Sequence, residues 1–475
     1  MIQQAIALLT LISILSITAQ EYQYAQDKPA HHTSPSSEST ETTFREERHQ
    51  GARVGRMRKG VRLPSRLDLI AEDRFEKIMP IQASFSGYVL YLIFGDTRQM
   101  VGDGGDFLII VPKKKIFDTC GKDINARGQF NTSMLETRIR AELQGPEIWG
   151  AHSFGYLEGD AFGDGALINR WRIRHAYLKL QWNTVSLLMG QFWHPMYVAD
   201  GECYPNTIGF DGGAPMEPFA RQPQLRIIKN WDHVRLITTA ASQLGYLSNG
   251  PIGFSSTYIR DAVIPNLDAQ LHWFSDESHL VGIGVDYKRL VPRLVSNDNF
   301  KVHESLSSIS VIGFAAGMFG DVHIASKVGY LQNATDFTTL GGYAVSCVSP
   351  VTDERTYTNL RDVTAWVDVE LQKKWSPGLY VGYVKNIGAD KPILTSLTNP
   401  QTNETESTIY TLLGGDIDYV FRVAPRVRYN TKPITIAGEI NFVRAAYGTI
   451  GLKGKVHNTD PVNGVRIALG AYLFF

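Results

Sequence analysis

The sequence predicts an all-β chain folded as a transmembrane antiparallel β-barrel of about 16 strands, and three observations support this. The 475 residues include 43 Gly, 21 Tyr, 22 Phe and 8 Trp, a composition typical of strands, tight turns and membrane interfaces. From residue 84 onward, short segments alternate apolar and polar side chains with a period of two. The connections between these segments alternate between short and long.

The alternating segments place apolar side chains on one face of each predicted strand. In 361–374, for example, Val363, Val367 and Leu371 share one face, opposite Thr364 and Asp368. A soluble β-sandwich would alternate in the same way, so this pattern alone leaves both architectures open. Strands are predicted at 84–94, 132–143, 150–160, 169–181, 184–191, 223–230, 233–244, 266–274, 279–290, 305–318, 321–331, 361–374, 378–387, 414–429, 433–446 and 463–475.

The lengths of the connections distinguish the two architectures. Short turns are predicted at 144–149, 182, 231–232, 275–278, 319–320, 375–377 and 430–432. Long connections are predicted at 95–131, 161–168, 192–222, 245–265, 291–304, 332–360, 388–413 and 447–462. Because a membrane barrel has tight periplasmic turns and long extracellular loops, this alternation favours a barrel. No apolar run reaches the roughly 18 residues that a membrane-spanning helix needs.

The N-terminal residues 1–19 are interpreted as a cleavable signal peptide. An apolar run extends from Ala5 to Ile17 and is followed by the small residues Thr18 and Ala19. No Lys or Arg precedes this run, and a buried strand or helix is the alternative interpretation. Residues 20–80 are polar, so we expect a largely disordered periplasmic segment there and a barrel over 81–475.

The C-terminal strand carries a more specific pattern. Its apolar face runs from Val465 through Leu469 to a terminal Phe475. Such an ending, after a signal peptide, resembles the insertion signal of outer-membrane proteins of Gram-negative bacteria. The stretches RWRIRHAYLKL, LLMGQFWHPM and GLYVGYVKNIGA also resemble the DcaP-like branch of the general trimeric porins. This resemblance implies a homotrimeric porin located in the cell outer membrane.

The inward faces of a barrel are its functional surface, because the outward faces must be apolar in lipid and about 16 strands enclose a water-filled lumen. Several of these inward positions carry arginines at a spacing of two, which places them on one strand face. In a soluble protein the same arginines would form a solvated face. The predicted pore-lining residues are Arg138, Arg140, Arg170, Arg172, Arg174, Arg226 and Arg235, with Glu158 and Asp160 at the rim.

The connection 192–222 follows the fifth predicted strand and is rich in Gly, Pro and acidic residues. In classical porins, the loop at this ordinal position folds into the lumen and faces an arginine cluster. The resemblance therefore implies that this loop constricts the pore and opposes acids to the arginines in a transverse field. The predicted constriction residues are Asp200, Glu202, Asp211, Glu217 and Arg221.

These features predict a channel for passive diffusion of small hydrophilic solutes, with a preference for anions or dicarboxylates. The alternatives are an occluded barrel with a surface-binding or structural role, and a barrel hydrolase, for which no GxSxG motif is present. Besides solutes, the expected partners are outer-membrane lipid and two further copies of the chain. The 47 basic and 47 acidic residues balance, so the sequence does not indicate nucleic acid as a partner. The spacing of its three Cys and twelve His indicates no metal site, and no cofactor is expected.

Overall fold

The computed structural model describes residues 81–101, 109–163, 170–201, 203–209, 212–276, 278–399 and 402–475. The predictions for the signal peptide and for the polar segment concern 1–80 and lie outside the described residues. Within the described part of the chain, no helix has the length and apolar character needed to cross a membrane.

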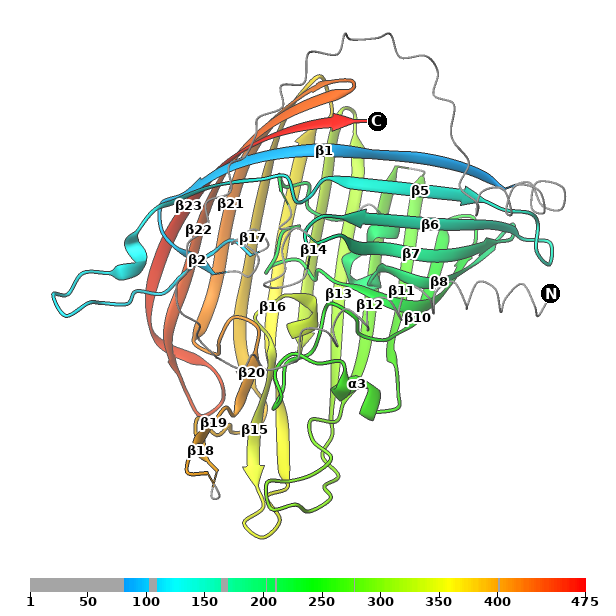
Figure 1. Ribbon diagram of the computed structural model, residues 1–475. Coiled ribbons are helices and arrows are strands. Elements are labelled where there is room, and N and C mark those ends of the chain that lie inside the picture. The colour runs from blue at the N-terminus through cyan, green and yellow to red at the C-terminus, as the bar shows by residue number, and fades with distance from the viewer. Residues whose placement is uncertain are drawn as a thin grey trace, which may run out of the picture. The chain divides into compact units, whose positions relative to one another are not determined.

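The described strands form a closed antiparallel barrel of 16 strands, which confirms the predicted fold. The barrel closes because β1 pairs with the C-terminal β23, from Tyr88 opposite Phe474 to Asp96 opposite Arg466. The strands in Figure 1 tilt strongly, so that β1, β5, β6 and β7 cross the direction of β13–β17 on the far wall. The barrel strands are β1 (Gln82–Asp96), the interrupted β4 (Gln129–Ser133) and β5 (Arg138–Gln144), β6 (His152–Asp160), β7 (Arg172–Gln181), β8 (Val185–Trp193), β9 (Arg221–Asn230), β10 (Val234–Ala241), β11 (Asn266–Asp276), β12 (His279–Leu290), β13 (Leu306–Phe319), β14 (Val322–Gln332), β16 (Arg355–Leu371), β17 (Trp375–Ala389), β21 (Ile417–Thr431), β22 (Ile434–Ile450) and β23 (Val456–Phe474).

Six short turns overlap the predicted ones: they lie at 145–151, 182–184 and 231–233, between Asp276 and His279, and at 320–321 and 432–433. The seventh lies at 372–374, and the residues predicted for it, 375–377, instead begin β17. The long connections hold the remaining elements. These are β2 (Met100–Val101), β3 (Val111–Pro112), β15 (Gly342–Val348), β18 (Leu397–Thr398), β19 (Thr405–Glu406), β20 (Ile409–Thr411), α3 (Thr257–Asp261), and the 3-10 helices η1 (Ile124–Ala126), η2 (Pro195–Tyr197), η3 (Ala199–Gly201) and η4 (Thr335–Phe337).

The barrel exposes apolar side chains and buries polar ones, the reverse of a water-soluble protein. Strand β11 shows this alternation along its length: Asp268 and His272 are buried inside, whereas Leu267, Leu271 and Trp273 are exposed outside. The strand pleat sends alternate side chains to opposite faces, so each strand presents one face to the lumen. An apolar exterior around a polar interior is the architecture of outer-membrane barrels.

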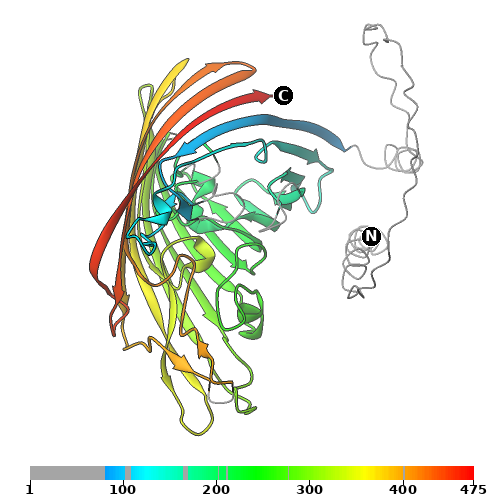
Figure 2. The ribbon, with the colours of Figure 1, turned by 60° about the vertical axis from the view of Figure 1, so that its left-hand side comes forward.

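The inner face of β1 is an exception, because it is apolar and covered by protein. The sequence predicts this, since both faces of residues 85–94 are apolar and one of them must point inward. In the structure, Leu90 and Phe94 pack in one cluster with Tyr197, Ile208 and Phe219 from the connection between β8 and β9. Figure 2 shows connecting segments lying on the concave side of the sheet. This connection, residues 194–220, is called the inward loop below.

The outer connections are tied together by ion pairs. Arg293 binds Glu304 at 2.6 Å and Asp353 at 2.9 Å, and Arg355 binds Glu406 at 2.5 Å. Burial works against ionisation of Asp353, but hydrogen bonds from the Arg293 side chain and a backbone amide outweigh it and lower the pKa of this carboxyl. Folding of these connections therefore favours the charged form of Asp353.

Candidate constriction site

Three neighbouring strands build a charged wall on the lumen side. Strand β5 supplies Arg138 and Arg140, β6 supplies Glu158, and β7 supplies Arg172 and Arg174. The antiparallel register sets Arg140 directly opposite Glu158, so the charges interdigitate on one face of the sheet. We call the four arginines together with Glu158 and Asp160 the arginine wall.

The two carboxylates fix the guanidinium groups in place. Glu158 accepts from Arg140 Nε at 2.6 Å and from Arg174 Nε at 2.8 Å. Asp160 accepts from Arg172 Nε and from Arg174 Nη1, both at 3.0 Å. Four cations thus share two anions, and the wall keeps an excess of positive charge. Arg174 is fully buried, whereas the side chains of Arg138 and Arg140 are 19% and 34% exposed and can meet a solute.

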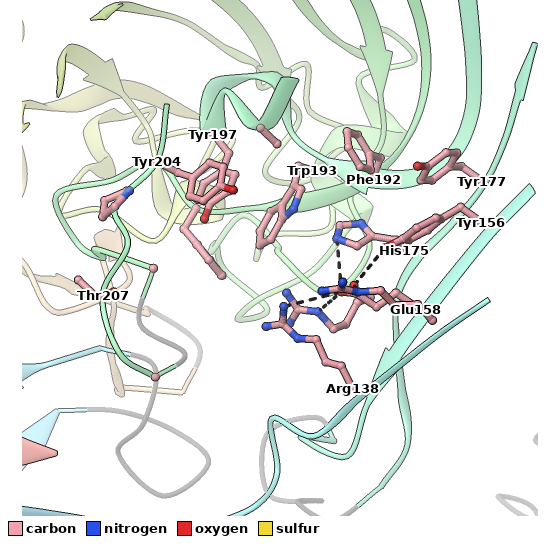
Figure 3. A pocket seen from close by; sticks show the side chains of 17 residues that line it. Arg138, Tyr156, Glu158, His175, Tyr177, Phe192, Trp193, Tyr197, Tyr204 and Thr207 are labelled. Atoms are coloured by element: carbon pink, nitrogen blue, oxygen red, sulfur yellow. Dashed lines mark hydrogen bonds and ion pairs between the residues drawn. The ribbon is translucent and has the colours of Figure 1, made fainter. Parts of the chain in front are cut away.

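Aromatic rings from the end of β8 and from the inward loop lie across from the arginine wall. Trp193 stacks on Tyr197 with ring centroids 4.2 Å apart, and Tyr197 stacks on Tyr204 at 5.4 Å. Figure 3 shows these rings on one side of the pocket, with Arg138 and Glu158 on the other. The cavity between them measures about 430 Å³, and its lining is Arg138, Arg140, Tyr156, Glu158, Arg174, His175, Tyr177, Phe192, Trp193, Tyr197, Ala199, Tyr204, Pro205, Thr207, Gly209, Gly212 and Phe219.

A buried ion pair holds the inward loop to the far wall of the barrel. Glu217 of the loop pairs with Lys327 of β14 and accepts a hydrogen bond from the indole of Trp366 on β16. Lys327 also donates to the carbonyl oxygens of Met196 and Tyr197, at 3.0 and 3.2 Å. One lysine therefore joins the beginning and the end of the loop.

Further contacts fasten the middle of the inward loop. Asn206 Nδ2 donates to Glu370 at 3.0 Å, and the hydroxyl of Tyr380 donates to the Gly213 carbonyl at 3.1 Å. Gly213 has a φ of +84°, and a Cβ there would lie 2.6 Å from the ring of Pro205. Only glycine allows this backbone conformation and the close packing of Gly213 on Pro205 within the loop without strain.

The base of the inward loop uses two of the predicted pore arginines. Arg226 forms an ion pair with Asp200, and Arg235 Nη1 donates to the Asp200 carbonyl oxygen at 2.9 Å. Arg221 is buried, and its guanidinium lies 4.9 Å from the ring centroid of Trp193. These three arginines hold the loop in place and do not line the cavity.

The structure corrects the expected partners of the loop acids. Asp200 and Glu217 do not pair with the arginine wall: Asp200 pairs with Arg226 of β9, and Glu217 pairs with Lys327 of β14. Glu202 and Asp211 lie outside the described residues. Arg170 precedes β7 and is exposed, so it does not belong to the wall.

The described residues therefore oppose the arginines with aromatic rings, where the sequence predicts acids. A spacing of two identifies residues on one strand face, but it says nothing about which charge on a distant strand meets a loop acid. The high aromatic content of 192–219 was a usable signal that the prediction left aside.

No protein-family model and no curated protein sequence matches this chain. Among solved structures, the crystal structure of the outer membrane channel DcaP of Acinetobacter baumannii is similar over 83% of this chain and 97% of that chain, with 15% identity and a TM-score of 0.59. The chain has the fold of an outer-membrane channel. This confirms, at the level of the fold, the resemblance that the sequence motifs indicate.

Two further porins show weaker similarity over the same 83% of the chain. The anion-selective porin from Comamonas acidovorans is 9% identical with a TM-score of 0.48, and the match covers all of that porin. OmpF of Salmonella typhi, in a complex with daunomycin, is 12% identical with a TM-score of 0.47, and the match covers 97% of it. At these identities the likeness concerns the fold, and the solute has to be argued from the site.

Proposed function

We propose that the chain is an outer-membrane porin, a water-filled channel for passive diffusion of small hydrophilic solutes that favours anions, including dicarboxylates. The observation that carries this proposal is the 430 Å³ cavity between the arginine wall and the inward loop. A loop that crosses the lumen narrows the passage at the point where the fixed charges gather, so solutes must pass close to the arginines.

The charge excess of the arginine wall favours anions. Each carboxylate of the wall is shared by at least two arginines, which leaves positive charge uncompensated at the cavity surface. Low-dielectric walls focus such a field into a narrow opening and raise the local concentration of the opposite charge. Guanidinium groups bind carboxylates with two parallel hydrogen bonds, and the partly exposed Arg138 and Arg140 are available for this.

The aromatic side of the cavity complements the arginines. The stacked rings of Trp193, Tyr197 and Tyr204 offer a rigid surface to the apolar part of a solute, while its carboxylates face the arginines. A solute with charged groups and a carbon skeleton would therefore pass in an oriented manner. The cavity therefore suits small organic anions better than simple inorganic anions, which have no carbon skeleton to contact the rings.

Reversal potentials in planar lipid bilayers test the proposal directly. We expect discrete channels whose reversal potential in a tenfold KCl gradient shows chloride to be more permeant than potassium. Dicarboxylates added to one side should reduce the chloride current at millimolar concentration by occupying the cavity. Cation-selective channels, or channels indifferent to added dicarboxylate, would contradict the proposed preference.

We also propose a homotrimer, based on the outer face of β1. Phe85, Val89 and Tyr91 are 64%, 48% and 48% exposed there, a row of large side chains suited to a subunit interface within the membrane. Native mass spectrometry in detergent should give three chains per particle. Val89→Arg should produce monomers, whereas the same substitution at the outward Val281 on β12 should leave the trimer intact.

A second candidate is an occluded barrel with a binding or structural role at the cell surface. Two further connections bury residues inside the barrel along with the inward loop. Met100 and Val111 of the first connection are fully buried, and the carbonyl of Phe337 accepts from the Phe219 amide at 2.9 Å. An occluded barrel would insert into bilayers without discrete conductance steps, so the same bilayer measurement separates the two candidates.

A further inference from the structure

Two acidic residues stand opposite each other inside the barrel, at the base of the inward loop. Asp268 on β11 is the register partner of Asp286 on β12, and both side chains point to the lumen side of the sheet. Like charges at directly paired positions repel each other and destabilise a sheet. Burial makes the repulsion worse, because water no longer screens the two carboxylates.

The neighbouring groups leave the charge of this pair uncompensated, although Asn266 Nδ2 donates a neutral hydrogen bond to Asp286 Oδ2 at 2.6 Å. Neither carboxylate oxygen of Asp268 makes a hydrogen bond of normal geometry in the described structure, and the residue is only 5% exposed. The amide nitrogen of the nearby Gln270 also lacks a hydrogen-bond partner in the described structure, whereas its oxygen lies 3.0 Å from His272 Nε2. Of the cations near the pair, Lys288 is bound to Asp336 and Arg226 is bound to Asp200. The two carboxylates therefore lack a positive charge to balance them among the described residues.

An imidazole completes the cluster. His194 begins the inward loop as the N-cap of η2, and its Nε2 lies 3.6 Å from Asp286 Oδ2 and 2.9 Å from Asn266 Oδ1. One ligand atom from each of His194, Asp268 and Asp286 lies within 4.8 Å of the others, and all three residues are buried. Atoms at this spacing can converge on one ion at roughly 2.0–2.2 Å with small side-chain rotations.

We propose that His194, Asp268 and Asp286 bind a divalent transition-metal cation, with Asn266 Oδ1 as a fourth donor. A nitrogen ligand together with carboxylates suits ions such as Zn²⁺ or Mn²⁺ better than Ca²⁺, which prefers oxygen ligands alone. Two carboxylates balance the charge of a divalent ion. The ion would supply the charge that the buried acidic pair lacks.

Binding at this position would couple the ion to the inward loop. Met196 N donates to His194 Nδ1 at 3.3 Å, so Nδ1 is the acceptor and Nε2 carries the ring proton. A metal ion on Nε2 moves that proton to Nδ1, since a ligating neutral imidazole keeps its proton on the other nitrogen. The Met196 amide then loses its acceptor, and the first turn of the loop adjusts. The ion would join the loop base to strands β11 and β12, while the weak Met196–His194 hydrogen bond would be lost.

Metal analysis of the purified full-length protein tests the proposal. The protein is stripped with dipicolinate, reloaded with Zn²⁺ or Mn²⁺, desalted and measured by inductively coupled plasma mass spectrometry. We expect one ion per chain in the wild type and in the control His272→Gln, which changes another buried histidine of β11 outside the cluster. Affinity should fall at least tenfold in His194→Gln and in the double variant Asp268→Asn/Asp286→Asn.

A melting experiment guards against misfolded variants and identifies the competing explanation. Wild-type protein should melt at a higher temperature with Zn²⁺ or Mn²⁺ than with chelator, and His194→Gln should lose this difference while keeping the barrel, as judged by its heat-modifiable mobility in gels. A pair of carboxyl groups that shares a proton would instead bind no ion and show no metal-dependent melting. That result, or equal metal content in wild type and variants, would overturn the proposal.

Discussion

Neutralising the two exposed arginines of the wall is the sharpest test of its role. In Arg138→Gln/Arg140→Gln, the buried Arg174 still pairs with both Glu158 and Asp160, so the barrel should keep its fold. The four cations and two anions of the wall become two and two. At about 4 Å, one unit charge contributes about 1 kcal/mol in bulk water and about 4 kcal/mol at an effective dielectric constant of 20.

The lower of these values already gives a measurable change. Two charges at about 1 kcal/mol each amount to about 2 kcal/mol, or roughly a 30-fold fall in the anion-to-cation permeability ratio. Salt of about 0.1 M screens beyond about 10 Å and reduces this, so the measurement belongs in dilute KCl gradients. The control Lys114→Gln/Lys115→Gln removes the same charge from an outer connection. An unchanged reversal potential in the arginine variant, with normal trimer yield, would show that the wall does not set selectivity.

Three further predictions concern the loops. With Cys120 and Cys347 replaced by Ser, a cysteine at Lys374 in a short turn should resist impermeant labelling of intact cells, while one at the exposed Val351 should react; the reverse would invert the topology. Glu217→Gln should leave the buried charge of Lys327 unpaired and lower the stability of the protein by about 3–5 kcal/mol. The double variant Glu217→Gln/Lys327→Met should recover much of this stability, as measured by thermal melts. Because the pKa of Asp353 is lowered, its charged form stabilises the fold fully at pH values above the ordinary pKa of a carboxyl group, and this effect disappears as the pH falls through the lowered pKa. Amide hydrogen exchange in 291–305, corrected for intrinsic rates, should therefore accelerate only in acid.

The sequence was sufficient for the barrel because each of its signals is local. A period of two assigns residues to the lipid or lumen face, and the alternation of short and long connections distinguishes a barrel from a sandwich. The apolar inner face of β1 even required a covering segment, and the inward loop provides it through Tyr197, Ile208 and Phe219. The arginine wall was predictable in part, since neighbouring strands of a hairpin set Arg140 beside Glu158.

The partners of the loop acids were not predictable, because they join residues far apart along the chain. Glu217 meets Lys327, and Asp200 meets Arg226, through contacts that depend on how the loop crosses the lumen. The acidic pair on β11 and β12 was within reach of the sequence. Once the hairpin that pairs Asp276 with His279 is fixed, the register places Asp268 opposite Asp286.

The way the loop acids are distributed explains how the proposed selectivity arises. If Asp200 and Glu217 faced the arginine wall, they would neutralise it and leave a dipolar passage with little preference for either sign of charge. Instead, both acids are neutralised where they anchor the loop, at Arg226 and at Lys327. The described part of the loop therefore narrows the lumen with uncharged aromatic rings, and neither Asp200 nor Glu217 offsets the excess positive charge of the wall. On this reasoning, an acid placed on the cavity side of the loop, as in Thr207→Glu, should reduce anion preference without widening the pore, which reversal potential and conductance report separately.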